Sequence, residues 1–198
     1  MKILVTGFGS FLDNNENPSS EILKLLPKSI YGSEIITVEL PVVYDQAFNV
    51  LRPLIEKYQP KLIINLGLAS GRTKISLEQV ALNINSSKGA DNAGTIFQDS
   101  PIIERGENAY FSSLPLRKIV EKLTLKRIPV EISYTAGTYV CNNLMYHVLH
   151  YIKENKLRIK AGFVHLPLMR ETKLVKDKAT LDLVVMLEGV IDIIKASM

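Results

Sequence analysis

The chain has 198 residues, of which 46% are hydrophobic and 22% charged, a composition typical of one globular domain with a full hydrophobic core, which we place at residues 1–198. The net charge of +4 is mild and its basic residues are scattered, so we predict no nucleic-acid partner. A single cysteine, Cys141, excludes an intramolecular disulfide, and with only three histidines it excludes a zinc site.

The first third of the chain alternates between strand and helix patterns. A short apolar run at 2–8 predicts a buried strand, and a helix is expected from about Ser20 to the stop at Pro27. A β-branched strand at 33–44, a helix at 45–58 and an apolar strand at 60–69 follow. Asp45 is expected to cap the second helix and Pro53 to kink it. This alternation favours a largely parallel sheet that is covered on both faces.

The middle of the chain departs from this alternation. Residues 74–84 are expected to be extended, although no helix separates them from the strand before. The polar stretch 85–113 is long for a loop in a compact domain, and we expect part of it to pair as a hairpin. The remaining patterns predict helices at 114–128, 138–155 and 178–197, with strands at 129–137 and 160–169.

The localisation can be argued from the same sequence. A lone thiol without a disulfide framework fits a reducing compartment. The N-terminal segment lacks the apolar region of a signal peptide, and no apolar run approaches the roughly 20 residues that span a bilayer. We therefore expect a cytoplasmic protein without a membrane partner.

Cys141 is the first candidate for chemistry. Gly137 is expected to end a strand and Thr138 to cap the next helix, so that Cys141 falls in the first helical turn. The unpaired N–H groups there stabilise negative charge, which predicts a lowered thiol pKa and a nucleophile. The alternative interpretation is a small buried hydrophobic residue, which is the common role of a free cysteine.

A thiol nucleophile needs a base, and His165 is the favoured candidate. It ends an apolar strand at the carboxyl edge of the sheet, where it can meet Cys141 if the two strands are neighbours. His147 and His150 follow Cys141 by six and nine residues, whereas same-face helical neighbours are three or four apart. We interpret these two as structural side chains.

Two carboxylates could orient the imidazole, namely Glu78 and Asp91. Glu78 lies in an otherwise apolar segment, where an unpaired carboxylate would be unfavourable. An ion pair with Arg72 is the competing explanation for Glu78. A rival function also remains open at this point, because the glycines of "VTGFGSF" (5–11) invite a nucleotide- or metabolite-binding module, although they lack a third glycine and a P-loop lysine.

Five motifs, in order and over nearly the whole chain, resemble those of the pyroglutamyl peptidase type I family, also called pyrrolidone carboxyl peptidases. They are "VTGFGSF…NPS" (5–19), "LGLASGRTKISLEQVALN" (66–83), "DN" (91–92), "TAGTYVCNNLMYHVLH" (135–150) and "GFVHLP" (162–167). The resemblance implies a single-domain three-layer α/β/α sandwich with a mixed, mostly parallel sheet, and a homotetramer. It implies a cysteine peptidase that removes an N-terminal pyroglutamyl residue from peptides and needs no metal or cofactor.

The resemblance also assigns residues. It implies a catalytic triad of Glu78, Cys141 and His165. It implies an apolar substrate pocket formed by Phe8, Phe11, Tyr139 and Val140.

Three positions depart from the pattern of the family. Gln79 and Lys88 stand where many relatives have arginine, and Asn143 stands where many have histidine. The arginine at the position of Lys88 is linked to the oxyanion region in the family, so that role is not expected here. The triad itself is intact, and we expect the peptidase activity to be retained.

Overall fold

A computed structural model describes residues 1–10, 17–172 and 179–198, so that Phe11, one of the expected pocket residues, lies outside the described residues. The strands are β1 (Lys2–Phe8), β2 (Ser29–Ile30), β3 (Ser33–Leu40), β4 (Leu62–Leu68), β5 (Ile75–Glu78), β6 (Val80–Leu82), β7 (Ala109–Phe111), β8 (Val130–Ser133), β9 (Lys160–Leu166), β10 (Leu168–Met169) and β11 (Thr180–Leu181). The helices are α1 (Pro18–Leu25), α2 (Gln46–Tyr58), α3 (Leu116–Leu125), α4 (Val140–Glu154) and α5 (Leu183–Ser197).

The main sheet has the strand order β2-β3-β1-β4-β9-β5-β8. β3, β1, β4 and β9 run parallel, and β5 and β8 are parallel to each other. The pair β5–β8 is reversed relative to these four strands, because β5 is antiparallel to β9, and the short β2 is antiparallel to β3. The sheet is therefore mixed and mostly parallel, as the resemblance implied.

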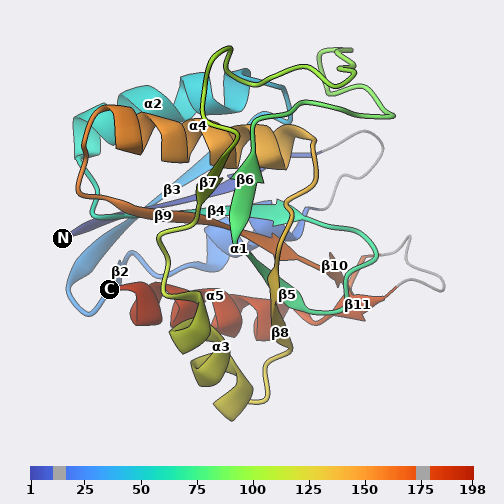
Figure 1. The fold of residues 1–198 in the computed structure, drawn as a ribbon. Helices are drawn as coiled ribbons and strands as arrows, with labels where there is room; N and C mark the ends of the chain where they lie inside the picture. Colours follow the sequence, from blue (N-terminus) through green and yellow to red (C-terminus); the bar gives the residue numbers. More distant parts are fainter. Residues whose placement is uncertain (11–16, 173–178) are drawn as a thin grey trace.

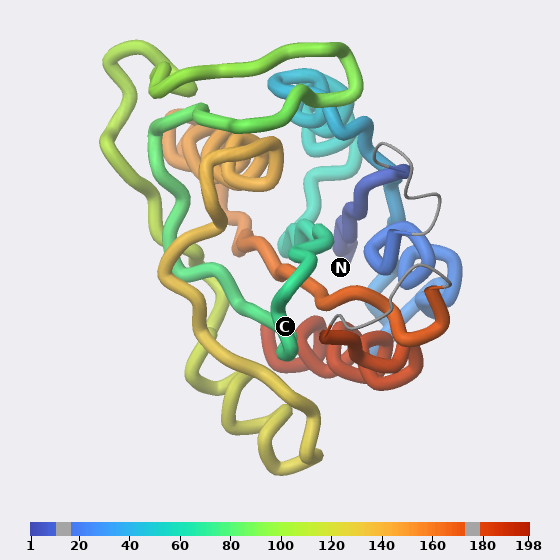
Figure 2. The backbone as a smooth tube through the Cα atoms, turned by 90° about the vertical axis from the view of Figure 1, so that its right-hand side faces the viewer, coloured from blue at the N-terminus to red at the C-terminus, as the bar shows by residue number. Residues whose placement is uncertain are grey.

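Helices cover both faces of this sheet, and Figures 1 and 2 show α2 and α4 on one side and α1, α3 and α5 on the other. The side chains of successive strand residues alternate between the two layers, as pleating requires. Ile63 and Phe163 belong to the α2/α4 core, whereas Ile64 and Val164 belong to the core under α1, α3 and α5. The architecture is a three-layer α/β/α sandwich. Among the described helices, none is both long enough and apolar enough to cross a membrane.

Several expected boundaries move for identifiable reasons. The first helix begins at Pro18 rather than near Ser20, because Asn17 caps it by accepting a hydrogen bond from the Ser19 N–H at 3.1 Å. Asp45 does precede α2, but its carboxylate makes no capping hydrogen bond. Pro53 lies inside α2 without ending it. The strand expected at 33–44 ends at residue 40.

The long polar stretch is organised around the expected hairpin. β6 pairs antiparallel with β7, and Asn85 bridges to Ser100 farther along the loop. The side chain of Asn83 accepts hydrogen bonds from the N–H groups of Ile102 and Ile103, both at 2.9 Å. These contacts fold the stretch over the α2/α4 layer, which Figure 1 shows at the top of the molecule.

Candidate active site

Cys141 is the second residue of α4, and its thiol lies over the centre of the sheet. Its Sγ is 3.1 Å from the point where a Cβ on Gly67 would lie. Gly67 belongs to β4 and is the register partner of His165 on β9, and the two Cα atoms of such a pair lie about 5 Å apart. The Cys141 thiol and His165 therefore lie next to each other on the face of the sheet that α4 covers.

His165 and Glu78 are joined by a buried hydrogen bond. His165 Nδ1 lies 2.7 Å from Glu78 Oε1, and the two side chains are 5% and 0% exposed. Because a carboxylate only accepts, Nδ1 carries the proton and donates it, which leaves Nε2 of the neutral ring as an acceptor. Of the two candidate carboxylates, Glu78 is thus the one beside His165.

The route that brings these residues together differs from our expectation. We expected His165 and the start of the Cys141 helix at the same edge of the sheet, where they would meet if their two strands were neighbours. The structure places β5 between β8 and β9, and β8 runs opposite to β9. Residues 134–139 return the chain to α4, which crosses above β4 and β9. The meeting of Cys141 with His165 depends on this crossing and not on a shared strand edge.

Asp91 has a different task from orienting the imidazole. Its carboxylate accepts hydrogen bonds from the N–H groups of Tyr44, Ala93 and Thr95 at 3.0, 2.9 and 2.9 Å. Burial raises the pKa of Asp91, but these N–H donors outweigh burial and hold the pKa below its ordinary value. Asp91 therefore ties the long loop to the segment before α2.

The protonation of the resting site is opposite to the expectation for Cys141. Burial raises the pKa of the Cys141 thiol to about 12, and the charge of Glu78 acts in the same direction, against Arg72 and the backbone N–H of Cys141. Burial also lowers the pKa of His165, although Glu78 favours its protonated form. Desolvation outweighs the helix N-terminus here, so the resting pair at neutral pH is a thiol and a neutral imidazole.

The start of α4 leaves backbone donors next to the thiol. Thr138 does not cap the helix, because its hydroxyl donates to Ser86 O at 2.6 Å; the N-cap is Tyr139, without a capping side-chain hydrogen bond. The intrahelical bonds begin with Asn143 N to Tyr139 O at 3.0 Å. The N–H groups of residues 140–142 precede this bond, which makes the first turn a place where an oxyanion is stabilised.

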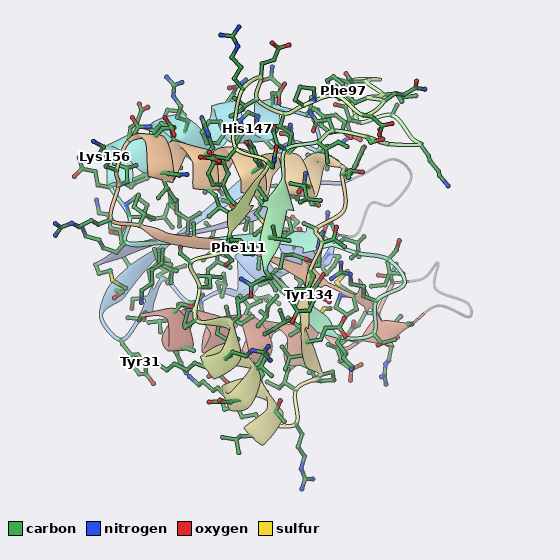
Figure 3. All side chains as sticks on the ribbon, in the orientation of Figure 1. Tyr31, Phe97, Phe111, Tyr134, His147 and Lys156 are labelled. Atoms are coloured by element: carbon green, nitrogen blue, oxygen red, sulfur yellow. The ribbon has the colours of Figure 1, made fainter. Side chains whose placement is uncertain are left out.

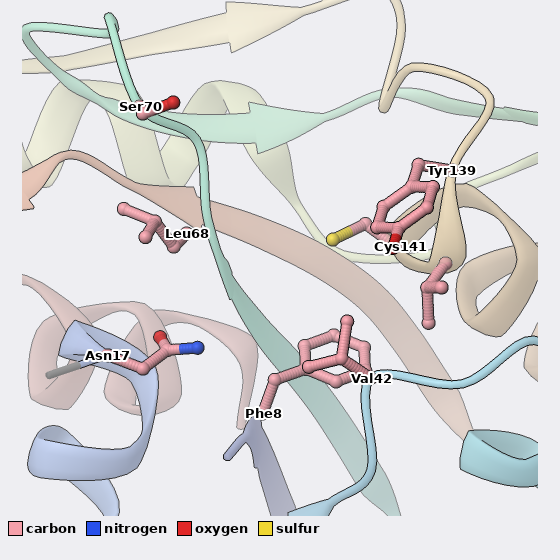
Figure 4. Close-up of a pocket in the computed structure, with 8 residues that line it drawn as sticks. Phe8, Asn17, Val42, Leu68, Ser70, Tyr139 and Cys141 are labelled. Carbon is pink, nitrogen blue, oxygen red and sulfur yellow. The ribbon is translucent and has the colours of Figure 1, made fainter. Parts of the chain in front are cut away.

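A cavity of about 180 Å³ opens beside the thiol (Figure 4). It is lined by Phe8, Asn17, Val42, Leu68, Ser70, Tyr139, Val140 and Cys141. Three of the four expected pocket residues, Phe8, Tyr139 and Val140, are therefore beside Cys141. Sequence reasoning missed the other lining residues. Asn17, Leu68 and Ser70 fall inside the motifs quoted above, whereas only the position of Val42 just after a strand could have suggested it.

Tyr139 is a fixed wall of this cavity. Its hydroxyl donates to Ala90 O at 2.9 Å, and its ring packs edge-on against Tyr44 with centroids 5.3 Å apart. Asp91 accepts hydrogen bonds from the Tyr44 N–H and from the loop that follows Ala90. The long loop therefore holds both of these contacts of the Tyr139 side chain in place.

The remaining histidines make contacts within the layer of α2 and α4 and the β6–β7 hairpin. His147 Nε2 donates to Asp45 Oδ1 at 3.0 Å, and its ring stacks on Phe48 at 5.1 Å. Figure 3 shows His147 in the outer layer of α2 and α4. His150 Nδ1 shares a hydrogen bond of 2.9 Å with the Tyr110 hydroxyl.

Asn143, one of the three departures, is fully buried and ties α4 to its surroundings. Its Nδ2 donates to Asp45 Oδ1 at 2.9 Å and to Asn85 Oδ1 at 3.2 Å, and its Oδ1 accepts from Asp45 N at 3.1 Å. The amide is thus satisfied on both sides without touching the thiol chemistry. Lys88 is exposed. Gln79 is half-buried, and its backbone N–H donates to Ser133 O at 2.8 Å.

The described part of the glycine-containing segment, at the end of β1, has its backbone N–H groups engaged within the protein and not open to a phosphate. The N–H of Phe8 donates to Ser19 Oγ at 2.9 Å, and that of Gly9 donates to Leu40 O at 3.1 Å. The carboxylate of Glu39 lies beside Gly9, 3.1 Å from the position of an added Cβ, and would repel an anion. The nucleotide- or metabolite-binding alternative is therefore not supported. Within the described residues, no group of three or more His, Cys, Asp and Glu side chains is placed to hold a metal ion.

Comparisons with known proteins identify one family. A family model described as pyroglutamyl peptidase matches residues 1–198. The pyrrolidone-carboxylate peptidase of Alkaliphilus oremlandii is 46% identical over 171 residues, covering 86% of this chain and 80% of the relative. That of Thermosipho africanus is 44% identical over 176 residues, with 89% and 86% covered.

Solved structures give the same result. The crystal structure of pyroglutamyl peptidase I from Bacillus amyloliquefaciens superimposes with a TM-score of 0.95 at 35% identity, covering 99% of this chain and 96% of that one. A mutant pyrrolidone carboxyl peptidase from Pyrococcus furiosus also gives 0.95 at 35% identity, with 100% and 98% covered. The chain belongs to the pyroglutamyl peptidase family.

Proposed function

We propose that this protein is a cysteine peptidase that hydrolyses the bond after an N-terminal pyroglutamyl residue and releases free pyroglutamate. The observation that carries the proposal is that Cys141 lines an apolar cavity and lies over Gly67, the register partner of His165, whose ring is hydrogen-bonded to Glu78. Membership of the pyroglutamyl peptidase family and the names of the relatives support the same activity.

The mechanism follows from the neutral resting pair. As Cys141 Sγ forms a bond to the pyroglutamyl carbonyl carbon, its proton passes to His165 Nε2, and the carbonyl oxygen becomes an oxyanion. The N–H groups at the start of α4, including that of Cys141, stabilise this oxyanion. Glu78 accepts from Nδ1 and stabilises the imidazolium while it exists.

The reaction is then completed in two stages, which are formation of the thioester and its hydrolysis. The C–N bond breaks as His165 Nε2 gives its proton to the leaving amine, which produces a thioester on Cys141. A water molecule adds to the thioester while His165 takes one of its protons. The C–S bond breaks, the proton returns to the thiol, and pyroglutamate leaves. No redox step is involved, and every proton is carried by His165.

Specificity in this proposal rests on charge. A pyroglutamyl ring is a neutral lactam, whereas an ordinary N-terminus has a pKa of about 8 and is mostly charged at pH 7. The described residues that line the cavity include no aspartate or glutamate, and most of them are apolar. An ammonium group there would be desolvated without a counter-charge, which costs several kcal/mol.

The test compares kcat/KM at pH 7 on pyroglutamyl, glutamyl, glutaminyl and prolyl amides of one fluorogenic amine. We expect the last three to be at least ~100-fold slower, which corresponds to about 2.7 kcal/mol. Cys141→Ser and His165→Ala should abolish cleavage, whereas His147→Ala and His150→Ala should retain it. Equal rates on the prolyl and pyroglutamyl amides would contradict selection against charge, and a folded Cys141→Ala protein with normal turnover would overturn the peptidase itself.

We also propose that residues 1–198 act as one domain in the cytoplasm, as a homotetramer, on N-terminally pyroglutamylated peptides. The lone thiol supports the compartment. The resemblance to the family supports the assembly state, and the family match over 1–198 supports the single domain. Light scattering on the purified protein distinguishes the homotetramer from a monomer or dimer.

A further inference from the structure

Arg72 connects two parts of the site that the mechanism needs to hold together. It lies between β4 and β5, and its Nη1 is 2.7 Å from Glu78 Oε1. Its Nη2 donates to the backbone oxygen of Thr135 at 3.2 Å. Thr135 belongs to the segment that leads directly into α4 and Cys141. One planar guanidinium therefore contacts both the carboxylate behind His165 and the approach to the nucleophile.

Glu78 needs a cation that His165 does not supply at rest. The Glu78 side chain is 0% exposed, and a neutral imidazole leaves its negative charge uncompensated. The side chain of Arg72 is 25% exposed, so its own charge keeps contact with solvent. Glu78 Oε1 accepts from both His165 and Arg72, while Oε2 has no hydrogen-bond partner among the described residues. The orientation of the Glu78 carboxylate is therefore determined by two hydrogen bonds to Oε1, one from His165 and one from Arg72.

We propose that Arg72 is a positioning residue of this active site, which holds Glu78 Oε1 against His165 Nδ1 and ties that carboxylate to the segment carrying Cys141. The proposal rests on the peptidase function proposed above. Arg72 is not among the residues that line the cavity, so it acts through Glu78 and not on the substrate ring.

The charge of Arg72 has a second effect on the same groups. The titratable or charged side chains that face the His165 ring are Glu78 from β5, Arg72 from the β4–β5 connection and Cys141 from α4, while β4 presents Gly67. Arg72 lowers the pKa of His165 and opposes the larger effect of Glu78. Removing the positive charge should therefore raise the pKa of His165, and the imidazole would be protonated over more of the neutral range.

The test uses two variants. Arg72→Gln removes both the positive charge and the guanidinium that donates to two partners, whereas Arg72→Lys keeps only the positive charge. For Arg72→Gln we expect kcat on the pyroglutamyl amide to fall ~10- to 100-fold with KM nearly unchanged, because a small misplacement of catalytic groups has effects of this size. The pKa of His165, followed by NMR and by the acid limb of kcat/KM, should rise. Arg72→Lys should keep the wild-type pKa of His165 and recover only part of kcat, because an ammonium cannot bond both partners.

A double-mutant cycle shows whether Arg72 works through Glu78. On a Glu78→Gln background, Arg72→Gln should lower kcat/KM by less than threefold further, since residues that act as a unit are not additive. Arg52, which pairs with Glu56 at 3.2 Å on the surface, provides the matched control, and Arg52→Gln should leave kcat and the pKa of His165 unchanged.

Three results would overturn the proposal. They are a normal kcat in folded Arg72→Gln or Arg72→Lys, an unmoved pKa of His165 in Arg72→Gln, and fully additive losses in the cycle. If Arg72→Gln does not fold, the double variant, which carries no unpaired charge, and Arg72→Lys still decide the question. An inactive wild-type protein would refute the peptidase function alone, because the NMR pKa of His165 tests Arg72 without any substrate.

Discussion

At the scale of single residues, the thiol of Cys141 is not activated in advance. Its pKa lies far above that of an ordinary cysteine because burial and the charge of Glu78 both disfavour the thiolate. The low pKa of His165 keeps the imidazole ready to accept a proton. Attack on the substrate and transfer of the thiol proton to His165 must therefore be coupled. The rate of alkylation should consequently report the fraction of thiolate at Cys141, whereas the rate of substrate cleavage should report the coupled transfer of the thiol proton to His165.

The rate of alkylation by iodoacetamide should report this difference, because the thiolate is the reactive form. With the Cys141 pKa raised to about 12, we expect the rate to keep rising with pH up to pH 9.5. A short uncharged peptide with blocked ends and one cysteine, run in parallel, should level off above its pKa of about 8.5. Glu78→Gln removes a negative charge and should speed alkylation at pH 8 while peptidase activity falls. A rate plateau below pH 7 for the protein would show that a stable thiolate exists at rest.

Single residues also show what the sequence can predict. The choice of Cys141 and His165 followed from where strands and helices change, whereas Glu78 and Asp91 both remained candidates until the family resemblance assigned Glu78. The structure places Glu78 against His165, and Cys141 over the neighbouring Gly67. The direction of the Cys141 pKa was wrong, because it depends on how completely the fold desolvates the thiol. That quantity comes from packing between distant segments, which no local pattern records.

At the scale of elements, the approach of α4 to β4 determines where the thiol lies. Gly67 provides the room for this approach. An added Cβ there would lie 2.8 Å from Phe163 Cζ and 3.1 Å from Cys141 Sγ. A methyl group at this position would therefore push the sulfur away from His165 or displace the Phe163 ring.

Gly67→Ala should reduce kcat by ~10-fold or more, since misplaced reacting groups have effects of this order. Overpacking should also lower the free energy of unfolding by about 1–3 kcal/mol. Gly89→Ala is the control, because nothing lies within 4 Å of its added Cβ. Both variants are compared by kcat on the pyroglutamyl amide and by urea unfolding. Wild-type kcat in Gly67→Ala would mean that the start of α4 shifts without consequence for the chemistry.

The order of elements was largely predictable, whereas their pairing was not. Periodicity and breakers placed every helix, and the absence of a helix between β4 and β5 indicated a break in the parallel pattern. That break turned out to be the reversal of β5 and β8. The pairing of β9 between β4 and β5 is a contact between segments far apart in the chain, and local propensity does not carry such information.

At the scale of the whole molecule, a buried carboxylate on α5 links this helix to α3. Asp192 on α5 is 2% exposed and faces two lysines of α3, with Lys122 Nζ at 3.3 Å and Lys126 Nζ at 2.5 Å. Burial raises the pKa of Asp192, but the two lysines outweigh burial and hold the pKa below its usual value. This group therefore stabilises the fold above the pKa of an unfolded aspartate, and the contribution is lost as pH falls through the folded pKa.

Asp192→Asn should accordingly lower the urea midpoint at pH 7 by a clear margin. The difference from wild type should stay constant between pH 7 and 5 and shrink only below about pH 4, where an unfolded aspartate becomes protonated. Glu188→Gln, on the exposed face of the same helix, is the control and should change the midpoint little. A difference that disappeared already at pH 6 would assign the effect to another group.

The position of β9 has a consequence for how the enzyme is made. β9 is the last strand of the main sheet to leave the ribosome, yet it occupies the place between β4 and β5, which were synthesised about eighty residues earlier. Until residues 160–166 arrive, β4 and β5 each present an unpaired edge, and His165 has not yet been synthesised. A nascent chain is therefore prone to stray edge pairing, and under the proposed mechanism peptidase activity begins only when the sheet closes at its centre.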